Sequence, residues 1–519
     1  MLSLLGASAV VVAVGRISAS RILAVIPTPS ISHQVVFRPL VQELARRGHE
    51  VTIITTDPVF TSSKFENLTE IDVHDVSYDI WTKNYIEHPE FGTKDFVFDN
   101  IYDLLEVHVR LIEVQLLSKG VQDIIHNKNI KFDLIMLEAV SRPSLIFSHL
   151  YKVPVIQVSS FGMMLDSGDV VGAPTHPLLY PIMLSQRIYQ RSFWEKICEL
   201  YKYWKVMRAY YNLEKQEHKI LQRIIENDLP NYDVLRNNIE MLFLNIHPIW
   251  VDNQPIPPNV ISIWGIYEKP KNDLPQDLKD YLDSSKNGVI YLSFGSNAQS
   301  SKLPQETLQM FIRVFSNLPY DVLWKWEIDE LPGKPPNIKI SKWLPQSDLL
   351  HHPSVKLFIT QGGLQSTEEA INAGVPVIGI PMFADQWYNV EKYVQHKIGL
   401  RLDFETLDEE KLKTAIDIVL NDTSYKENMV LLRDLMKDEP HSGLERAVWW
   451  TEYVLRHGGA RHLRAAAANM SWAQYYELQL ILMMLSLLGA SAVVVAVFIR
   501  LVWKYVMRNL ITQIKIKTR

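Results

Sequence analysis

Residues 357–389, LFITQGGLQSTEEAINAGVPVIGIPMFADQWYN, contain two apolar runs separated by a segment with a helical pattern. The first run predicts a buried strand, Gly362-Gly363 a turn, and the middle segment a helix that ends at Gly374. The second run predicts another strand, followed by a loop. A strand, a helix and a second strand in this order form a βαβ unit, whose strands are parallel.

The Gly362-Gly363 turn lies immediately before the predicted helix. Glycine lets a ligand approach the backbone, and a helix N-terminus offers unpaired N–H groups and a positive dipole end, which suit a phosphate. Ser366 and Glu369 also fit the Ser-x-x-Glu pattern of a capping box, which has only a structural role. This segment alone therefore leaves a phosphate site and a simple helix start equally open.

The same pattern recurs on both sides of a proline-rich segment. Strands are predicted at 21–26, 50–55, 131–137 and 153–158, and again at 289–294, 321–326, 356–360 and 376–380. Six prolines gather between residues 245 and 275, which indicates a linker. The chain is predicted to hold two doubly wound α/β domains, with a ligand cleft between them at the carboxyl ends of their strands.

Length and charge exclude several classes of protein. The chain has 519 residues, with 53 basic and 58 acidic side chains and a formal net charge of −5. This balance argues against nucleic acid as the main partner, because phosphate binding needs concentrated lysine and arginine. Cys198 is the only cysteine, which excludes an intrachain disulfide framework and a cysteine-based zinc site.

The C-terminal part has the pattern of a membrane anchor. Residues 480–499 carry no charge and, as a helix, would cross a hydrocarbon core of about 30 Å. Residues 500–519 are basic and contain no acid, so the positive-inside rule places this tail in the cytosol. A buried core helix fits this pattern less well. The sequence predicts a single-pass type I membrane protein whose large part is lumenal.

The two ends of the chain also resemble targeting signals. The apolar run at 1–14 and the small residues Ser18-Ala19-Ser20 predict a signal peptide at 1–20, although no basic residues precede the run. MLSLLGASAVVVAV at 1–14 recurs unchanged at 484–497, which leaves the true start of the chain open. The last five residues, KIKTR, resemble a dilysine retrieval signal of the endoplasmic reticulum membrane. Possible glycan acceptors are Asn67, Asn421 and Asn469.

Residues 177–215 are unusually rich in aromatic side chains mixed with basic ones. One interpretation is an amphipathic helical insertion that packs on the core. The other is a patch that lies on the membrane or lines an apolar substrate entrance. The aromatic residues are Tyr180, Tyr189, Phe193, Trp194, Tyr201, Tyr203, Trp204, Tyr210 and Tyr211.

Four segments occur in a fixed order along the second half of the chain. They are VIYLSFGSNAQ at 289–299, WLPQSDLLHHP at 343–353, the segment 357–389, and AVWWTEYVLRHGGARHLR at 447–464. Together they resemble the signature of membrane-bound UDP-glycosyltransferases, and the resemblance runs from about residue 21 to the tail. The form TQGGLQST is most similar to the insect branch.

This resemblance implies a fold of the GT-B type, with two Rossmann-like domains that face a cleft and one C-terminal transmembrane helix. The expected division is an N-terminal acceptor-binding domain at 21–255, a linker at 256–284, a C-terminal UDP-sugar-binding domain at 285–455, a membrane-proximal segment at 456–479, the transmembrane helix at 480–499 and a basic cytosolic tail at 500–519.

The resemblance also implies a donor site. Trp343 would stack on uracil, Gln346 would contact the base or ribose, and Glu369 would accept bonds from ribose hydroxyls. No cofactor or metal is expected, because the chain has no Asp-x-Asp triplet and a helix N-terminus can stabilise the leaving group. The residues expected to hold the pyrophosphate are Ser296, Gln361, Gly362, Gly363 and Ser366, and those expected to hold the sugar are Asp385 and Gln386.

The expected general base is His33, in the loop after the first strand, where PTPSISHQ matches the place of the family's catalytic histidine. Its imidazole suits proton transfer near neutral pH. Glu138, at the end of a buried run, matches a position that is often aspartate and that fixes the histidine tautomer. A single displacement would invert the anomeric centre, so that an α-linked donor gives a β-glycoside.

Two residues depart from the family pattern. Glu138 replaces the commoner aspartate, and its extra methylene shifts the carboxylate by about 1 Å. Gln361 replaces a histidine and can donate a hydrogen bond but never carry a charge. We expect an active enzyme despite both changes.

Three functions remain compatible with this sequence. The first is transfer of a hexose, expected to be glucose, from UDP-sugar to small lipophilic hydroxyl compounds, as in detoxification. The second is a non-catalytic membrane protein that binds UDP-sugar or a lipophilic ligand, and the third is a transferase for one membrane lipid. The sequence does not decide between donors, between acceptors, or between a monomer and a homo-oligomer.

Overall fold

The computed structural model describes residues 19–59, 66–86, 92–225, 229–268, 271–296 and 298–517. The predicted signal peptide lies outside these residues except for Ala19 and Ser20, as does the first copy of the repeated 14-mer. The last two residues of the dilysine motif lie outside them as well.

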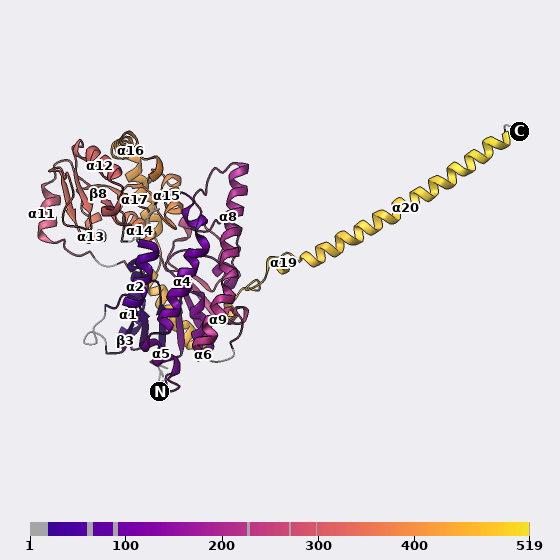
Figure 1. Cartoon of the computed structure of the whole chain (residues 1–519), viewed down its shortest axis with the longest axis horizontal. Coiled ribbons are helices and arrows are strands. Elements are labelled where there is room, and N and C mark those ends of the chain that lie inside the picture. Colours follow the sequence, from indigo (N-terminus) through magenta and orange to yellow (C-terminus); the bar gives the residue numbers. More distant parts are fainter. Residues whose placement is uncertain are drawn as a thin grey trace, which may run out of the picture.

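Two sheets form the globular part, and all strand pairs in both are parallel (Figure 1). The seven-stranded sheet has the order β3-β2-β1-β4-β5-β6-β7, and the six-stranded sheet has the order β10-β9-β8-β11-β12-β13. The predicted pair of doubly wound domains is confirmed. The strands are β1 (Arg21–Ile26), β2 (Glu50–Thr55), β3 (Leu68–Asp72), β4 (Leu134–Glu138), β5 (Val155–Ser159), β6 (Ile239–Leu244), β7 (Val260–Ser262), β8 (Val289–Ser293), β9 (Asp321–Lys325), β10 (Ile338–Ser341), β11 (Val355–Thr360), β12 (Val377–Gly379) and β13 (Gly399–Arg401).

Helices connect these strands. The N-terminal domain contains α1 (Ile31–Arg46), α2 (His74–Trp81), α3 (Phe96–Asp99), α4 (Ile101–Leu116), α5 (Lys119–His126), α6 (Ile146–Tyr151), α7 (Ser167–Val171), α8 (Phe193–Asn212), α9 (Glu214–Ile225) and α10 (Tyr232–Arg236). The C-terminal domain contains α11 (Gln276–Ser284), α12 (Gln305–Ser316), α13 (Gln346–Leu350), α14 (Leu364–Ala373), α15 (Gln386–Gln395), α16 (Glu409–Asn421) and α17 (Ser424–Lys437).

The core follows from strands that are apolar on both faces. In β1, Ile22, Ala24 and Ile26 pack on one side of the sheet, whereas Leu23 and Val25 pack on the other. Successive strand residues point to opposite faces, so both faces of a parallel sheet need a helical cover. The helices α1 and α18 (Gly443–His457) cover one face, and α4, α5, α6, α9 and α10 cover the other.

The structure corrects the expected domain boundaries at two places. The predicted linker 256–284 contains β7, which pairs with β6 and so completes the first sheet, and it also contains α11. The helix α18 was expected in the C-terminal domain, but it packs on α1 and the first sheet. At its first residue, Gly443, a Cβ would lie 2.4 Å from the Ile263 carbonyl oxygen, so only glycine permits this approach.

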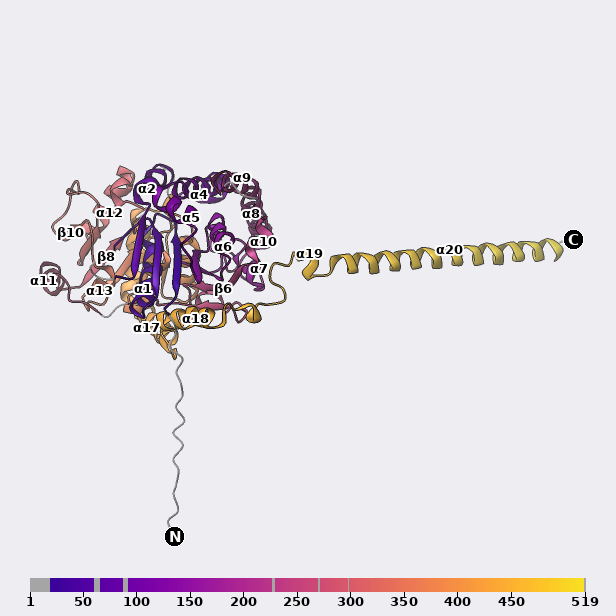
Figure 2. The ribbon, with the colours of Figure 1, turned by 90° about the horizontal axis from the view of Figure 1, so that it is seen from below.

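The helix α20 (Leu478–Lys517) projects away from the globular part (Figures 1 and 2). Within the described residues, it is the one helix long and apolar enough to cross a membrane. Its 40 residues make it about 60 Å long at 1.5 Å per residue. The helix therefore continues through most of the predicted tail beyond the expected span.

A buried ion-pair network joins the segment after β4 to the helices α8 and α9, which lie between β5 and β6. Arg142 donates to both carboxylate oxygens of Glu217 at 2.7 Å, to Glu214 at 3.0 Å and to the Tyr210 carbonyl at 2.7 Å. Both Arg142 and Glu217 are buried. Removing one partner of such a pair lowers the stability of the fold strongly, because the other charge then remains buried and unpaired.

We expect Arg142→Ala to destabilise the N-terminal domain by about 3 kcal/mol. For a domain of this size, that cost lowers the melting temperature by about 6–12 °C. The matched control is Arg46→Ala, because Arg46 pairs with Glu43 at an exposed surface. The control should change stability by less than about 1 kcal/mol. Equal melting temperatures for both variants would contradict this assignment.

Candidate active site

The strand order of each sheet predicts where its ligands bind. The order reverses direction between β1 and β4 in the first sheet and between β8 and β11 in the second. Ligands of such sheets bind at the carboxyl ends of the strands beside this switch point. A cavity of about 1060 Å³ lies there between the two domains, and residues after all four strands line it.

His33 and Glu138 lie in contact at the carboxyl edge of the first sheet. His33 is in the first turn of α1, because the extended Ser30 already starts the helix; it was expected in a loop. Its Nδ1 contacts Glu138 Oε1, and the Thr28 backbone N–H donates to Glu138 Oε2 at 3.2 Å. Glu138 is 1% exposed, and burial alone would raise its pKa. The charge and hydrogen bond of His33, with the bond from Thr28, outweigh burial and lower the pKa of Glu138 below its ordinary value.

Three residues expected to bind the nucleotide form one hydrogen-bonded group. Gln346 Nε2 donates to Glu369 Oε2 at 2.7 Å and to Ser366 Oγ at 3.0 Å, and the Tyr291 hydroxyl donates to Gln346 Oε1 at 3.0 Å. Burial raises the pKa of Glu369 to about 7, against the hydrogen bond from Gln346. The capping-box alternative for Ser366 and Glu369 is wrong, because α14 begins after Gly363 and no side chain caps it.

The loop after β11 brings backbone and amide groups to the cavity. Gly362 has φ +87°, and a Cβ there would lie 2.5 Å from Val390 Cγ2, so the turn packs tightly against α15. Gly363 directly precedes α14, whose first N–H groups have no partner within the helix. Gln361 Oε1 is buried without a hydrogen-bond partner in the described part of the chain. Of the predicted phosphate-binding residues, Ser296, Gln361, Gly363 and Ser366 line the cavity, whereas Gly362 packs behind them.

Trp343 lies at the mouth of the same cavity, directly before α13. Its side chain is 63% exposed, so it is not a core residue. An exposed indole at a cleft offers a free aromatic face to a flat ligand.

Asp385 and Gln386 lie at the start of α15, on the cavity wall. Burial raises the pKa of Asp385 to about 6, against the hydrogen bond that Asn389 Nδ2 donates to it at 2.7 Å. Gln386 Oε1 accepts from the backbone N–H groups of Met382 and Phe383, both at 2.8 Å, so its oxygen already holds the loop.

Contacts between the domains pair residues whose partners the sequence did not indicate. Trp250 of the N-terminal domain donates from Nε1 to Asn389 Oδ1 at 3.0 Å, and Asn389 holds Asp385. Gln365 Nε2 donates to the Ser32 carbonyl at 3.0 Å, beside His33. These pairs are 139 and 333 residues apart in the chain, and no local pattern could have identified them.

The N-terminal wall of the cavity is mostly apolar. His108, on α4, lies half-buried in this wall, and burial lowers its pKa, which favours the neutral ring. A mostly apolar wall suits a lipophilic molecule. Its apolar lining includes Trp81, Val97, Ile101, Leu104, Ile112, Phe161, Met164, Leu184 and Leu213.

Comparison with known proteins agrees with this geometry. The family described as "UDP-glucoronosyl and UDP-glucosyl transferase" matches residues 21–516. An ecdysteroid UDP-glucosyltransferase of Spodoptera littoralis nuclear polyhedrosis virus is 35% identical over 487 residues, covering 90% of this chain and 94% of that protein. The UDP-glucosyltransferase 2 of Dactylopius coccus is 33% identical over 470 residues, covering 90% of each.

Solved structures show the same fold at lower identity. The glycotransferase of kitacinnamycin aligns with a TM-score of 0.57 at 18% identity, over 84% of this chain and 100% of that one. The calicheamicin glycosyltransferase CalG4 aligns with the same TM-score and identity, over 84% of this chain and 98% of that one. The fold is of the GT-B type. With the match over nearly its whole length, the chain belongs to the UDP-glucuronosyl and UDP-glucosyl transferase family and is a UDP-glycosyltransferase.

Proposed function

We propose that this enzyme is an inverting transferase that moves glucose from UDP-glucose to a hydroxyl of small lipophilic molecules, giving β-glycosides. The observation that carries the proposal is the contact between His33 and Glu138, because His33 lines the same cavity as the N-terminus of α14. A general base and a helix N-terminus that can bind a diphosphate thus lie at the same cavity.

The donor has a place along the C-terminal wall. Trp343 stacks on uracil, Gln346 contacts the base or ribose, and Glu369 accepts from the ribose hydroxyls. The pyrophosphate lies at the α14 N-terminus, where N–H groups without a partner inside the helix and the helix dipole stabilise its charge without a metal. Its other contacts are Ser296, Gln361, Gly362, Gly363 and Ser366, whereas Asp385 and Gln386 hold the sugar hydroxyls.

The reaction is a single displacement. His33 Nδ1 is engaged with Glu138, so Nε2 takes the proton from the acceptor hydroxyl. The oxygen bonds to the anomeric carbon as the bond to UDP breaks on the opposite face, which inverts that carbon. Glu138 holds the imidazole tautomer and stabilises the imidazolium that forms.

The acceptor occupies the apolar N-terminal wall. Several relatives are named ecdysteroid UDP-glucosyltransferases, and steroids of this class are therefore the first acceptors to test. The wall itself favours a rigid lipophilic body with one hydroxyl near His33. The same names support glucose as the transferred sugar.

We also propose that the enzyme is a single-pass type I protein of the endoplasmic reticulum membrane with its catalytic part in the lumen. The apolar helix α20 and the basic residues in it support this orientation. Of the three possible glycan acceptors, Asn421 is exposed, whereas Asn67 Nδ2 donates to two backbone carbonyls at 2.7 Å. Asn421 is thus the acceptor that the folded protein best accommodates.

Loss of the base should abolish turnover and leave donor binding intact. We expect His33→Ala to lower kcat by about 10²–10⁴-fold, because positioned general bases contribute this much. The dissociation constant for UDP should stay unchanged by calorimetry. The control is His126→Ala, at an exposed histidine of α5. Full turnover in His33→Ala would place the base elsewhere.

Loss of the stacking indole of Trp343 should weaken binding of the donor nucleotide alone. We expect Trp343→Ala to raise the dissociation constant for UDP by about 5–150-fold, since base–aromatic stacking contributes about 1–3 kcal/mol. Trp343→Phe should retain most of the affinity. As a control, Trp449→Ala removes an exposed indole outside the cavity. A normal dissociation constant for Trp343→Ala would rule out the stacking role.

The pKa of Glu369 predicts a pH-dependent affinity for UDP. The ionised carboxylate accepts from ribose hydroxyls, and its pKa is raised to about 7. Protonation below that pH removes the negative charge and turns one carboxylate oxygen into a donor, so the affinity for UDP should fall by up to about tenfold per pH unit from pH 7 to 5.5. Titration calorimetry of wild type against Glu369→Gln isolates this effect from protonation of UDP. Identical pH profiles would contradict it.

A further inference from the structure

An apolar stripe runs along the outer face of α8. Its side chains recur at helical spacings of three and four residues, and each is between 41% and 72% exposed. Soluble proteins seldom expose so many large apolar side chains together on one helix. The stripe consists of Phe193, Trp194, Ile197, Leu200, Tyr201 and Trp204.

The opposite face of α8 belongs to the acceptor side of the protein. Val206 and Ala209 are buried among Trp81, Leu104 and Leu184, three residues that line the cavity. One helix therefore separates the apolar cavity wall from the exposed stripe. The sequence left two interpretations of this region open, and the structure shows a helix that packs on the core with one face and leaves the other uncovered.

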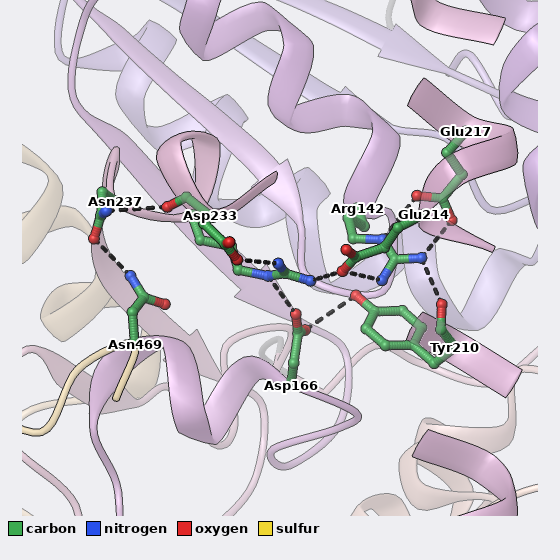
Figure 3. Close-up of polar contacts among 9 residues, drawn as sticks. Arg142, Asp166, Tyr210, Glu214, Glu217, Asp233, Asn237 and Asn469 are labelled. Carbon is green, nitrogen blue, oxygen red and sulfur yellow. Dashed lines mark hydrogen bonds and ion pairs between the residues drawn. The ribbon is translucent and has the colours of Figure 1, made fainter. Parts of the chain in front are cut away.

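The C-terminal end of α8 is tied to the segment that leads into α20. Tyr210 donates from its hydroxyl to Asp166 at 3.0 Å, and Arg236 donates to Asp166 at 2.8 Å (Figure 3). The next residue, Asn237, accepts from Asn469 Nδ2 at 2.7 Å. Asn469 thus fixes the membrane-proximal segment to the elements that hold α8.

The arrangement in space agrees with these contacts. Figures 1 and 2, viewed at right angles, both place α8 on the side of the globular part from which α19 (Trp472–Tyr475) and α20 leave. The residues just before the apolar helix include exposed aromatics, which are typical of a membrane–water interface. These are Trp472, Tyr475 and Tyr476.

We propose that the outer stripe of α8 lies in the headgroup region of the bilayer that α20 crosses. Interfacial helices combine Trp, Phe and Leu on one face with basic residues beside it. Exposed Lys196 and Arg208 lie on α8, and the Arg208 guanidinium stands 5.0 Å from the Trp204 ring centre. Lipid contact would bring the cavity wall to the membrane, so that lipophilic acceptors enter beside α8. This last consequence rests on the proposed function, whereas the lipid contact does not.

The lone cysteine makes the contact measurable. Cys198 is exposed on α8, so a nitroxide label attaches there alone in the full-length chain. The protein is reconstituted in liposomes of phosphatidylcholine with anionic phosphatidylserine. We expect the label to collide more often with oxygen, which concentrates in lipid, than with a water-soluble nickel chelate. The matched control is Lys279→Cys with Cys198→Ser, on α11 at the opposite end of the molecule (Figures 1 and 2).

Two outcomes would overturn the proposal. One is a Cys198 label as accessible to the nickel chelate as the Lys279→Cys label. The other is strong spin–spin broadening at low protein-to-lipid ratio, which would show that a second copy of the chain covers the stripe.

A variant tests the stripe itself. Trp194→Ser with Trp204→Ser should remove the preference of the label for oxygen, and an unchanged preference would contradict the proposal. The same variant should raise the KM for a bilayer-dissolved acceptor several-fold and leave the KM for UDP-glucose unchanged. If wild type forms no glycoside with any acceptor, the proposed function fails, but the collision measurement still decides the lipid contact.

Discussion

Parallel pairing of every strand is the constraint on which this enzyme depends. It places all carboxyl ends of the seven-stranded sheet at one edge and all those of the six-stranded sheet at another. Each crossover must then return along a face of its sheet, so the loops that can carry chemistry gather at those two edges. His33 and Glu138 come from one edge, and the turn before α14 comes from the other.

The two sheet edges can form one site only if the two domains keep a fixed position relative to each other. A continuous apolar core does part of this, since Trp250 packs in one cluster with Tyr393 and Phe358 of the second domain. Lys392 restricts how the two domains can be placed, because its fully buried ammonium pairs with Asp252 across the interface at 2.7 Å. A buried charge without that partner would be costly, so alternative placements of the domains are disfavoured.

The sequence predicted the central strands because they are apolar on both faces, as β1, β4, β8 and β11 are. It missed β3, β7, β10 and β13, which are short or partly exposed and lie at the edges of their sheets. It also missed β6, although this strand is buried along its whole length. It assigned α18 to the wrong domain, since an apolar stripe shows that a helix is covered but not by which sheet. The family motifs contain most of the residues on the C-terminal wall of the cavity, but they do not show that Gln365 and Asn389 bond to the N-terminal domain, because those partners are distant in the chain.

Three carboxyl groups around the cavity differ in a way that supports the proposed division of roles. Glu138 and Asp385 are buried and Glu369 is half-buried. Glu138 alone contacts an imidazole, and its pKa is lowered, whereas the pKa values of Asp385 and Glu369 are raised to about 6 and about 7. When the environments of carboxyl groups push their pKa values apart, the groups can take different roles in one site. Glu138 therefore stays ionised to hold its histidine. Asp385 and Glu369, held only by amides, gain most from ligand hydroxyls that complete their hydrogen bonding.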